Sequence, residues 1–307
     1  MHDLATLPPA PASPAPVAIQ HYENFPVASL LCPAHLRSPI SAIYHFARTA
    51  DDLADEGCND APARLADLRA YRAELLAAAG VQTDADEPGL GHDPAGSRRW
   101  AQVFGPLRTL IAAHQLPLNL LTDLLDAFEQ DVRFTHEQRR YATDAELLDY
   151  CTRSANPVGR LLLHLYGITD ATALAQSDAI CTALQLINFW QDVSVDVARG
   201  RWYPSTEAMT RFGVTDADLQ PASQSPAATL LIAAYASAAR AGMLKGLKLA
   251  LTVPGRSGWE LRLVVQGGLR ILDKIEALQY ATWRTRPKLT LRDAPLLLWR
   301  AWRMGHG

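Results

Sequence analysis

The sequence is short of the features that mark several specialised protein classes. Only 4 of its 307 residues are cysteine, and none of the four stands in a CxxC pair. Neither a disulfide framework nor a cysteine-rich zinc site is therefore expected, and reduced, buried thiols in a cytoplasmic protein are favoured. The net charge is only −3. Because no basic field surrounds such a chain, nucleic acid is not expected as a partner.

Long apolar runs and a secretion signal are also lacking. The longest apolar candidate, LLIAAYASAA, ends at Arg240 and is shorter than the roughly 18 residues that a membrane span needs. Residues 1–20 have neither the basic start nor the apolar centre of a signal peptide. They are rich in proline and alanine, so we expect a disordered tail there.

Strand-like alternation is scarce, whereas helical periodicity is almost continuous beyond residue 20. Apolar residues recur at three- and four-residue spacings, as on one face of a helix. The pattern predicts helices over residues 22–32, 38–56, 61–80, 98–114, 117–134, 144–167, 177–198, 226–252, 258–283 and 294–303. Turn-forming residues predict loops over 84–96, 212–226 and 253–258. The expected fold is a single all-α domain.

What the sequence does have is a concentration of acid in one short stretch, ARTADDLADEG. With a helix expected to begin at the Ser-Pro pair of residues 38–39, Asp51 and Asp55 share one face of its last turn. The helix dipole opposes each acid there by roughly 0.3–1 kcal/mol, and the two carboxylates repel each other. Tyr44 and Arg48 extend the same face. Either this is a solvated helix end, or a cation gathers the carboxylates.

A second polar face occurs in QLINFWQDVSVD. Asn188, Asp192 and Asp196 are spaced by four residues, and Gln185 lies about one turn earlier. Apolar neighbours on nearly all other sides indicate a buried helix, where a carboxylate needs a partner. Following arginines, including Arg201, would serve in a structural ion-pair network. A divalent cation is the stronger interpretation, and oxygen-only ligands favour Mg²⁺ or Mn²⁺ over zinc.

A third polar face is basic. Arg262, Gln266, Arg270 and Lys274 recur every four residues among leucines and valines. This is either a solvated face or an anion site opposite the acids. Two carboxylate faces that meet across Mg²⁺ ions holding a diphosphate would explain the crowded acids, and the apolar wall suits a hydrocarbon. The residues alone predict metal-assisted ionisation of a prenyl diphosphate.

The two acidic motifs, together with HYENFPVASLLCP, YCTRSANPVGRLLLHLYG and GRWYP, resemble the squalene/phytoene synthase family from residue 21 to about residue 289. The resemblance implies a class I isoprenoid synthase-like helical bundle with a central cavity over residues 21–290. An amphipathic tail over 291–307 would follow it. The tail, with its sequence APLLLWRAWRMG, would either rest on the inner membrane surface or pack on the bundle.

The resemblance also implies residue roles. It makes Asp51 and Asp55 the first metal-binding pair, and Asn188, Asp192 and Asp196 the second set. The positions that match the diphosphate and prenyl site of relatives, together with those that the polar faces add, are Phe25, Tyr44, Arg48, Tyr150, Gln185, Arg201, Arg270, Lys274 and Tyr280.

Three positions depart from the commonest family pattern. Gln191 stands where many members have an arginine, Val195 replaces an acid, and Asn156 with the following proline replaces smaller residues. These features resemble the bacterial hydroxysqualene synthases of hopanoid biosynthesis. They imply ionisation of presqualene diphosphate, rearrangement and water capture without NADPH, with the product handed on to other hopanoid enzymes. Gln191 and Asn156 would then hold the water, or else Asn156 merely caps a kink.

Two other functions fit the same residues. A head-to-head prenyl synthase would make presqualene diphosphate, squalene or phytoene from two allylic diphosphates with the same metal ligands. A non-catalytic family member acting as a scaffold would not need its aspartates, although all five expected ligand positions hold oxygen donors. Magnesium-dependent binding of a diphosphate analogue distinguishes this last possibility from the other two.

Overall fold

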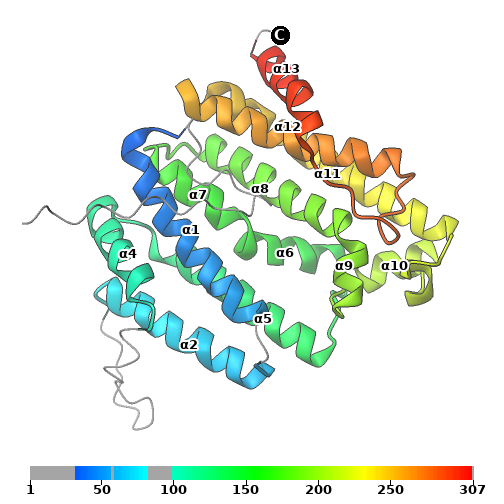
Figure 1. The fold of residues 1–307 in the computed structure, drawn as a ribbon, viewed down its shortest axis with the longest axis horizontal. Helices are drawn as coiled ribbons and strands as arrows, with labels where there is room; N and C mark the ends of the chain where they lie inside the picture. The colour runs from blue at the N-terminus through cyan, green and yellow to red at the C-terminus, as the bar shows by residue number, and fades with distance from the viewer. Residues whose placement is uncertain (1–31, 57–58, 82–98, 306–307) are drawn as a thin grey trace, which may run out of the picture.

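The computed structural model describes residues 32–56, 59–81 and 99–305, and every regular element in these ranges is helical (Figure 1). The α-helices are α1 (Ala34–Asp55), α2 (Ala61–Ala78), α4 (Ala101–His114), α5 (Leu118–Glu137), α6 (Asp144–Ser154), α7 (Asn156–Leu165), α8 (Ala171–Gln191), α9 (Val193–Ala198), α10 (Thr206–Phe212), α11 (Pro226–Thr252), α12 (Gly255–Ala277) and α13 (Ala294–Met304). Short 3₁₀ turns are η1 (Asp216–Leu219) and η2 (Leu291–Asp293). The predicted all-α fold is confirmed. The expected tail over 1–20 and loop over 84–96 lie outside the described residues, as does nearly all of the helix expected over 22–32.

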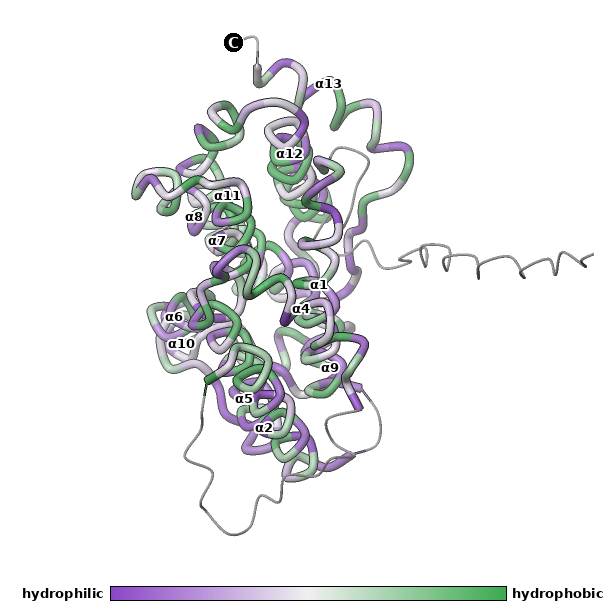
Figure 2. Tube along the Cα trace, turned by 90° about the vertical axis from the view of Figure 1, so that its left-hand side faces the viewer, coloured by the Kyte–Doolittle hydropathy of each residue, from purple (hydrophilic) through white to green (hydrophobic). Residues whose placement is uncertain are grey.

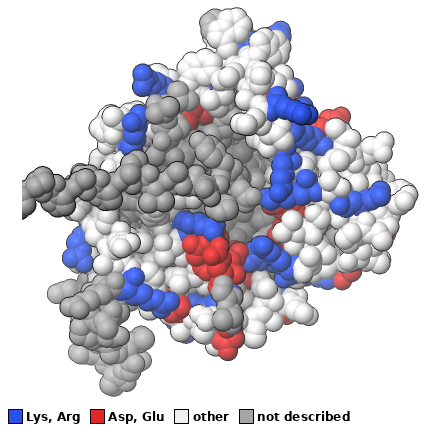
Figure 3. All heavy atoms as spheres, in the orientation of Figure 1, with Lys and Arg blue, Asp and Glu red and all other residues white. Residues whose placement is uncertain are grey.

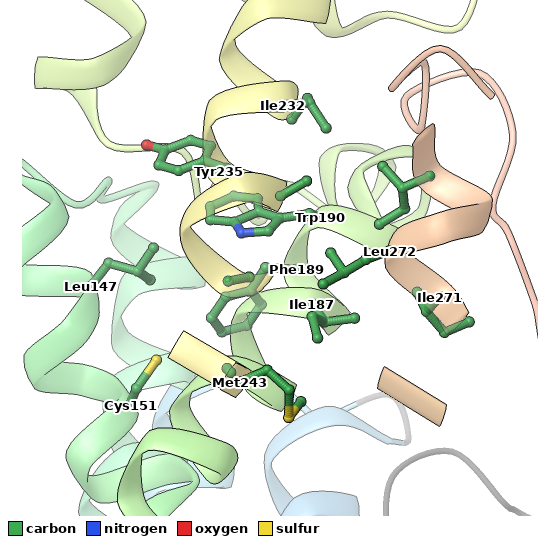
Figure 4. Packing of buried hydrophobic residues seen from close by; sticks show 14 of the residues in the cluster. Leu147, Cys151, Ile187, Phe189, Trp190, Ile232, Tyr235, Met243, Ile271 and Leu272 are labelled. Atoms are coloured by element: carbon green, nitrogen blue, oxygen red, sulfur yellow. The ribbon is translucent and has the colours of Figure 1, made fainter. Parts of the chain in front are cut away.

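Two hydrophobic clusters hold the bundle together. One fills the space between α1, α2, α4 and α5, around Phe46 and Tyr71. The other lies between α8, α11 and α12, where Trp190 stacks on Tyr235 with ring centroids 4.0 Å apart (Figure 4). Helix α7 contributes leucines to both clusters. It therefore joins the two halves of the core.

Helix α11 is long and apolar enough, by length and composition alone, to cross a membrane, and it is the one such helix in the described ranges. It packs along α8 and against α12. At Gly246 the two backbones approach so closely that an added Cβ would lie 2.5 Å from the carbonyl oxygen of Gln176. Other helices alternate hydrophobic and hydrophilic segments along the tube of Figure 2. Packing in the bundle therefore accounts for part of the apolar composition of α11, of whose most apolar window 39% is buried.

The first helix begins earlier than the sequence predicts. Helix α1 starts at Ala34, and Pro39 lies inside it rather than at its first turn. Leu36 is only 3% exposed. Burial of this side chain in the cluster around Phe46 and Tyr71 stabilises an additional turn of helix. This gain offsets the backbone hydrogen bond that a proline cannot donate.

Two predicted helices are each divided in the structure. The helix expected over 144–167 breaks between α6 and α7 at Ala155, next to Asn156 and Pro157. The helix expected over 177–198 begins earlier, at Ala171, and breaks between α8 and α9 at Asp192. Helix α10 was not predicted. Both breaks lie in motifs with expected functional residues.

Three of the four cysteines are in the described ranges. Cys32, Cys151 and Cys181 are free thiols, and the first two are buried. Burial raises the pKa of Cys151 to about 12. These thiols are therefore protonated, apolar core groups, in keeping with the sequence-based expectation.

Candidate active site

A cavity of about 300 Å³ lies between α1, α7, α8, α11 and α12. Most of its wall is aliphatic, from Ile40, Ala47, Val158, Leu162, Leu163, Leu184, Leu249, Val253, Leu261 and Val264. Three residues predicted from the sequence also line it, namely Tyr44, Gln185 and Asn188. An apolar chamber with a few polar groups suits a hydrocarbon chain that carries one polar end.

Close helix packing shapes this wall. Gly159 of α7 lies against Ser177 and Cys181 of α8, and a Cβ there would collide with both side chains. All three residues line the cavity. The absence of a side chain at Gly159 therefore sets how near α7 comes to α8, and hence the width of the chamber.

The acidic end of α1 is held by one arginine. Arg48 contacts three carboxylates, at 3.0 Å from Asp51, 2.7 Å from Asp52 and 2.8 Å from Glu56. Burial, together with the neighbouring carboxylate of Asp55, raises the pKa of Asp51 to about 6. The single positive charge of Arg48 therefore does not neutralise these carboxylates. Figure 3 shows acidic side chains gathered on one face of the molecule, with basic side chains beside them.

A second arginine relieves the unfavourable end of the helix. Arg64, at the start of α2, donates through Nη1 to the carbonyl oxygen of Ala54 at 2.5 Å. A cation is favourable at this terminus because the last carbonyls of a helix carry partial negative charge. The end of α1 can therefore carry acids that helix physics alone would oppose.

Arg201 lies between the two acidic motifs. It follows α9 and donates to a carboxylate oxygen of Asp55. Burial alone would lower the pKa of Arg201, but the bond to Asp55 raises it above its usual value. The charge of Arg201 also favours the ionised forms of Asp51 and Asp196. Acids more than 140 positions apart in the sequence thus act on one guanidinium.

The second motif follows the break between α8 and α9. Asp192 accepts two hydrogen bonds from Arg286, at 2.5 Å from Nε and 2.9 Å from Nη2. Burial and the nearby Asp192 raise the pKa of Asp196 to about 7. Arg286 was not predicted as a site residue. It lies far along the chain in a segment without helical periodicity, so its sequence position carried no signal.

Asp131 of α5 is another residue that the sequence interpretation missed. The phenolic oxygen of Tyr150 donates to it at 2.6 Å. Burial raises the pKa of Asp131 to about 7, and the charges of Arg201 and Asp55 act on it. A signal was present, because Asp131 falls at helical spacing on the same stripe as Leu124 and Phe128. A carboxyl on an apolar stripe needs a partner.

The two residues expected to hold water lie elsewhere. Gln191 donates through Nε2 to the carbonyl oxygen of Pro287 at 2.8 Å. The side-chain oxygen of Asn156 accepts from the Thr182 hydroxyl at 2.9 Å. Neither Gln191 nor Asn156 lines the cavity. Their contacts connect segments of the bundle, which agrees with the structural alternative for Asn156.

The basic face of α12 also has structural partners. Arg270 and Lys274 donate to Asp293 at 2.8 and 2.7 Å, and Asp293 is only 4% exposed. Lys274 also donates to the carbonyl oxygen of Lys288. These contacts hold the C-terminal segment against α12. Neither basic residue lines the cavity, and their expected role as an anion site facing the acids stays a prediction.

Two further expected residues complete the comparison. Tyr280 lies beyond the end of α12 in the left-handed conformation, with φ 62°, and packs against the cluster around Trp190 rather than lining the cavity. Phe25 lies outside the described residues. The structure thus brings the acids, Tyr44, Gln185 and Arg201 to one region, and leaves Tyr280 partly buried against the core.

The acids fit a divalent cation by their chemistry. Within 32–56, 59–81 and 99–305, no group of three or more histidine, cysteine or acidic side chains forms a ready metal site. The acids instead form two pairs, Asp51 with Asp55 and Asp192 with Asp196, which arginines contact. Carboxylate and amide oxygens are the ligands that Mg²⁺ and Mn²⁺ prefer. The raised pKa values indicate uncompensated negative charge that a cation would relieve.

Comparison with known proteins decides the family. The squalene/phytoene synthase family matches residues 19–293. The chain belongs to this family. A hydroxysqualene synthase of Sinorhizobium fredii is 31% identical over 288 residues, covering 94% of this chain and 89% of the relative. One from Rhodopseudomonas palustris is 35% identical over 206 residues. That match covers 67% of this chain and 62% of the relative's length.

A solved structure agrees with this family assignment. The crystal structure of squalene synthase HpnC from Alicyclobacillus acidocaldarius superposes with a TM-score of 0.71 at 36% identity. The match covers 85% of this chain and 90% of that one. The helical bundle expected from the resemblance is therefore confirmed as this family's fold.

Proposed function

We propose that the protein converts presqualene diphosphate and water into hydroxysqualene and diphosphate. The observation that carries this proposal is an apolar cavity lined by Tyr44 of α1, the helix that carries Asp51 and Asp55, and by Asn188 in the last turn of α8, directly before Asp192. Similarity to hydroxysqualene synthases supports the choice among family reactions. The balance of the reaction requires no reductant, which is why NADPH is not included.

Each group of residues has a role in this proposal. Mg²⁺, or Mn²⁺ in its place, would be held by Asp51, Asp55, Asn188, Asp192 and Asp196, and would neutralise the charge that develops on the departing diphosphate. Arg48 and Arg201 already contact these acids and would turn to the diphosphate oxygens. The aliphatic wall would enclose the hydrocarbon and exclude bulk water from the cation.

The test is a product assay on purified protein. Presqualene diphosphate and farnesyl diphosphate are supplied separately with Mg²⁺, without NADPH, and each reaction is repeated with excess chelator. We expect hydroxysqualene from presqualene diphosphate only, and none with chelator. Turnover of farnesyl diphosphate would instead support the head-to-head synthase. Inactivity in both reactions, with the protein folded, would favour the non-catalytic scaffold.

We further propose that the protein is cytoplasmic and contacts the inner membrane through α13 and the turn before it. Four apolar side chains there are well exposed, namely Leu291 (93%), Leu298 (53%), Trp299 (51%) and Trp302 (51%). In an amphipathic helix, tryptophan and leucine enter the headgroup region of a bilayer. Figure 1 shows α13 extending from the bundle on the side of α12.

Charge favours an anionic bilayer as the occupant of this surface. Residues 284–304 include six basic residues and one acid, and that acid, Asp293, is buried. Sedimentation with phosphatidylglycerol vesicles tests the proposal, with phosphatidylcholine as reference. Trp299→Ser should reduce binding, whereas Leu244→Ser, at an exposed position on α11, should not. Equal binding by both variants, or self-association in place of vesicle binding, would contradict it.

A further inference from the structure

One buried hydroxyl in the cavity wall lacks a hydrogen-bond partner. Ser154 Oγ is inaccessible to solvent and pairs with no other group in the described part of the chain. Ser154 also lines the cavity. Buried polar atoms are normally hydrogen-bonded, because leaving one unpaired is unfavourable. An unpaired hydroxyl in an otherwise aliphatic wall therefore calls for a ligand.

The break between α6 and α7 explains why this hydroxyl has no internal partner. Ser154 is the last residue of α6, and Ala155 leaves helical geometry with φ −123° and ψ −49°. A helical serine often bonds the carbonyl four residues earlier, but Ser154 makes no such bond. Its oxygen is covered in the present rotamer, and rotation about the Cα–Cβ bond would present it to a molecule in the cavity.

The position of Ser154 along the cavity follows from contacts on either side. One turn earlier, the ring of Tyr150 lies 6.2 Å from that of Phe189 on α8. Two residues later, Asn156 bonds Thr182, also on α8. The α6–α7 segment and α8 are therefore antiparallel here, and Ser154 lies at the level of Gln185. Gln185 lines the same cavity.

On the basis of the proposed function, we propose that Ser154, with Gln185, holds the water molecule that captures the carbocation. Water in a protein interior needs two or more polar partners. The serine hydroxyl and the glutamine amide supply these from two helices, so an oxygen lone pair of the water is left to point into the cavity. Ser154 is thus a positioning residue that acts through the water.

The chemical step balances without a further reactant. The bond between carbon and the diphosphate oxygen breaks, leaving diphosphate and a carbocation that rearranges. A lone pair of the held water forms the new carbon–oxygen bond, and the resulting oxonium releases its proton to the diphosphate. One water is consumed, and nothing is oxidised or reduced. Without a held water, the cation would lose a proton from carbon and yield an elimination product, a hydrocarbon with one more double bond than the alcohol.

The ratio of alcohol to elimination product is the quantity that the experiment measures. Ser154→Ala removes the hydroxyl, and we expect the ratio of alcohol to elimination products to fall roughly three- to ten-fold, the effect of one lost hydrogen bond. Ser154→Thr keeps a hydroxyl and should restore most of the ratio. Thr152→Ala is the matched control, because Thr152 lies on the same helix outside the cavity wall and its hydroxyl already donates to the carbonyl oxygen of Asp149 at 2.6 Å. Its product ratio should equal that of the parent.

Product analysis with presqualene diphosphate separates the two proposals. If the parent forms no alcohol, the proposed function fails. If the parent forms alcohol and Ser154→Ala keeps the parental ratio, the water site is overturned and the function stands. A change of ratio in Ser154→Ala that Ser154→Thr does not restore would assign the effect to cavity shape. An equal change in Thr152→Ala would assign it to a general disturbance of α6, and either result would also overturn the water site. Circular dichroism of each variant confirms folding.

Discussion

The charge clusters at the end of α1 and on α12 differ in how fully their charges are matched. On α12, Arg270 and Lys274 share the buried carboxylate of Asp293, which also accepts from Thr290. At α1, four acids occur within six residues, and the arginines that reach them leave the pKa of Asp51 raised to about 6. The matched cluster connects segments of the fold, whereas the unmatched one lies beside the cavity helices.

The opposite pKa shifts show what this difference means. For Asp293, burial alone would raise the pKa, but hydrogen bonds from Lys274 and Thr290 lower it below its usual value. For Asp51, burial and a neighbouring acid raise the pKa. Folding therefore favours the charge on Asp293 and opposes the charge on Asp51. Removing the charge of Asp293 should therefore lower stability, whereas removing the charge of Asp51 should lower activity without lowering stability.

The largest expected effect is on activity, from Asp51→Asn combined with Asp55→Asn. We expect diphosphate release to fall by at least about 1,000-fold, because cation ligands for the departing group are lost. Stability at pH 7 should not fall through loss of the Asp51 charge. A raised pKa means that this charge destabilises the fold as pH rises from 3.8 to about 6. Initial rates and thermal unfolding at pH 7 measure both; retained activity would contradict the site.

The next effect is on stability, from Asp293→Asn. Loss of a buried carboxylate with two cationic partners should lower the free energy of unfolding at pH 7 by roughly 2–4 kcal/mol. Because the folded-state pKa is lowered, this stabilisation is present above pH 3.8 and is lost as the pH falls through the folded-state value. Urea unfolding at pH 7 and at pH 3 checks this, with the exposed Glu276→Gln as control. Equal stability of variant and parent at pH 7 would contradict the comparison.

Arg286→Gln should give an intermediate effect on both quantities. It removes a two-pronged bond to Asp192, so we expect a loss of about 1–2 kcal/mol in stability. If Arg286 transfers to the diphosphate, KM should rise more than kcat falls. Steady-state kinetics with presqualene diphosphate measure the two constants. A fall in kcat alone would mean that Arg286 acts only after binding.

Gln191→Leu should have the smallest effect. The bond from Gln191 to the Pro287 carbonyl is worth about 1 kcal/mol of stability. The ratio of alcohol to elimination product should change less than in Ser154→Ala. Denaturant unfolding and product analysis test both expectations. A larger change of ratio at Gln191 than at Ser154 would return the water-holding role to Gln191, as its residue type first suggested.

Periodicity predicted the helices well where each packs as one amphipathic unit. The predicted and observed bounds of α11 coincide at 226–252. Periodicity could not show that α6 and α7 are separate, because apolar spacing continues across Ala155 while the backbone does not. The start of α1 was also misplaced, since Leu36 is buried by distant parts of the chain.

The sequence indicated charge clusters but not their counter-ions. Acid spacing predicted that Asp51 and Asp55 lie together near the end of α1, but not that the second set spans the break between α8 and α9; Arg201 lies between the two sets. Basic spacing on α12 was equally regular, yet its partner Asp293 lies some twenty residues later, in a short turn. Spacing along one helix cannot reveal a partner from another segment. Arg286 was missed for the same reason.

Because arginines already contact the acidic pairs, a cation that binds here would replace arginine contacts rather than fill an unoccupied site. A divalent cation that reaches Asp55 or Asp192 would compete there with Arg201 or Arg286, and a displaced guanidinium in a largely buried site needs another anion. A cation arriving with a diphosphate supplies that anion, whereas a bare cation does not. In the proposed reaction, metal and substrate should therefore bind cooperatively, with weak affinity for metal alone.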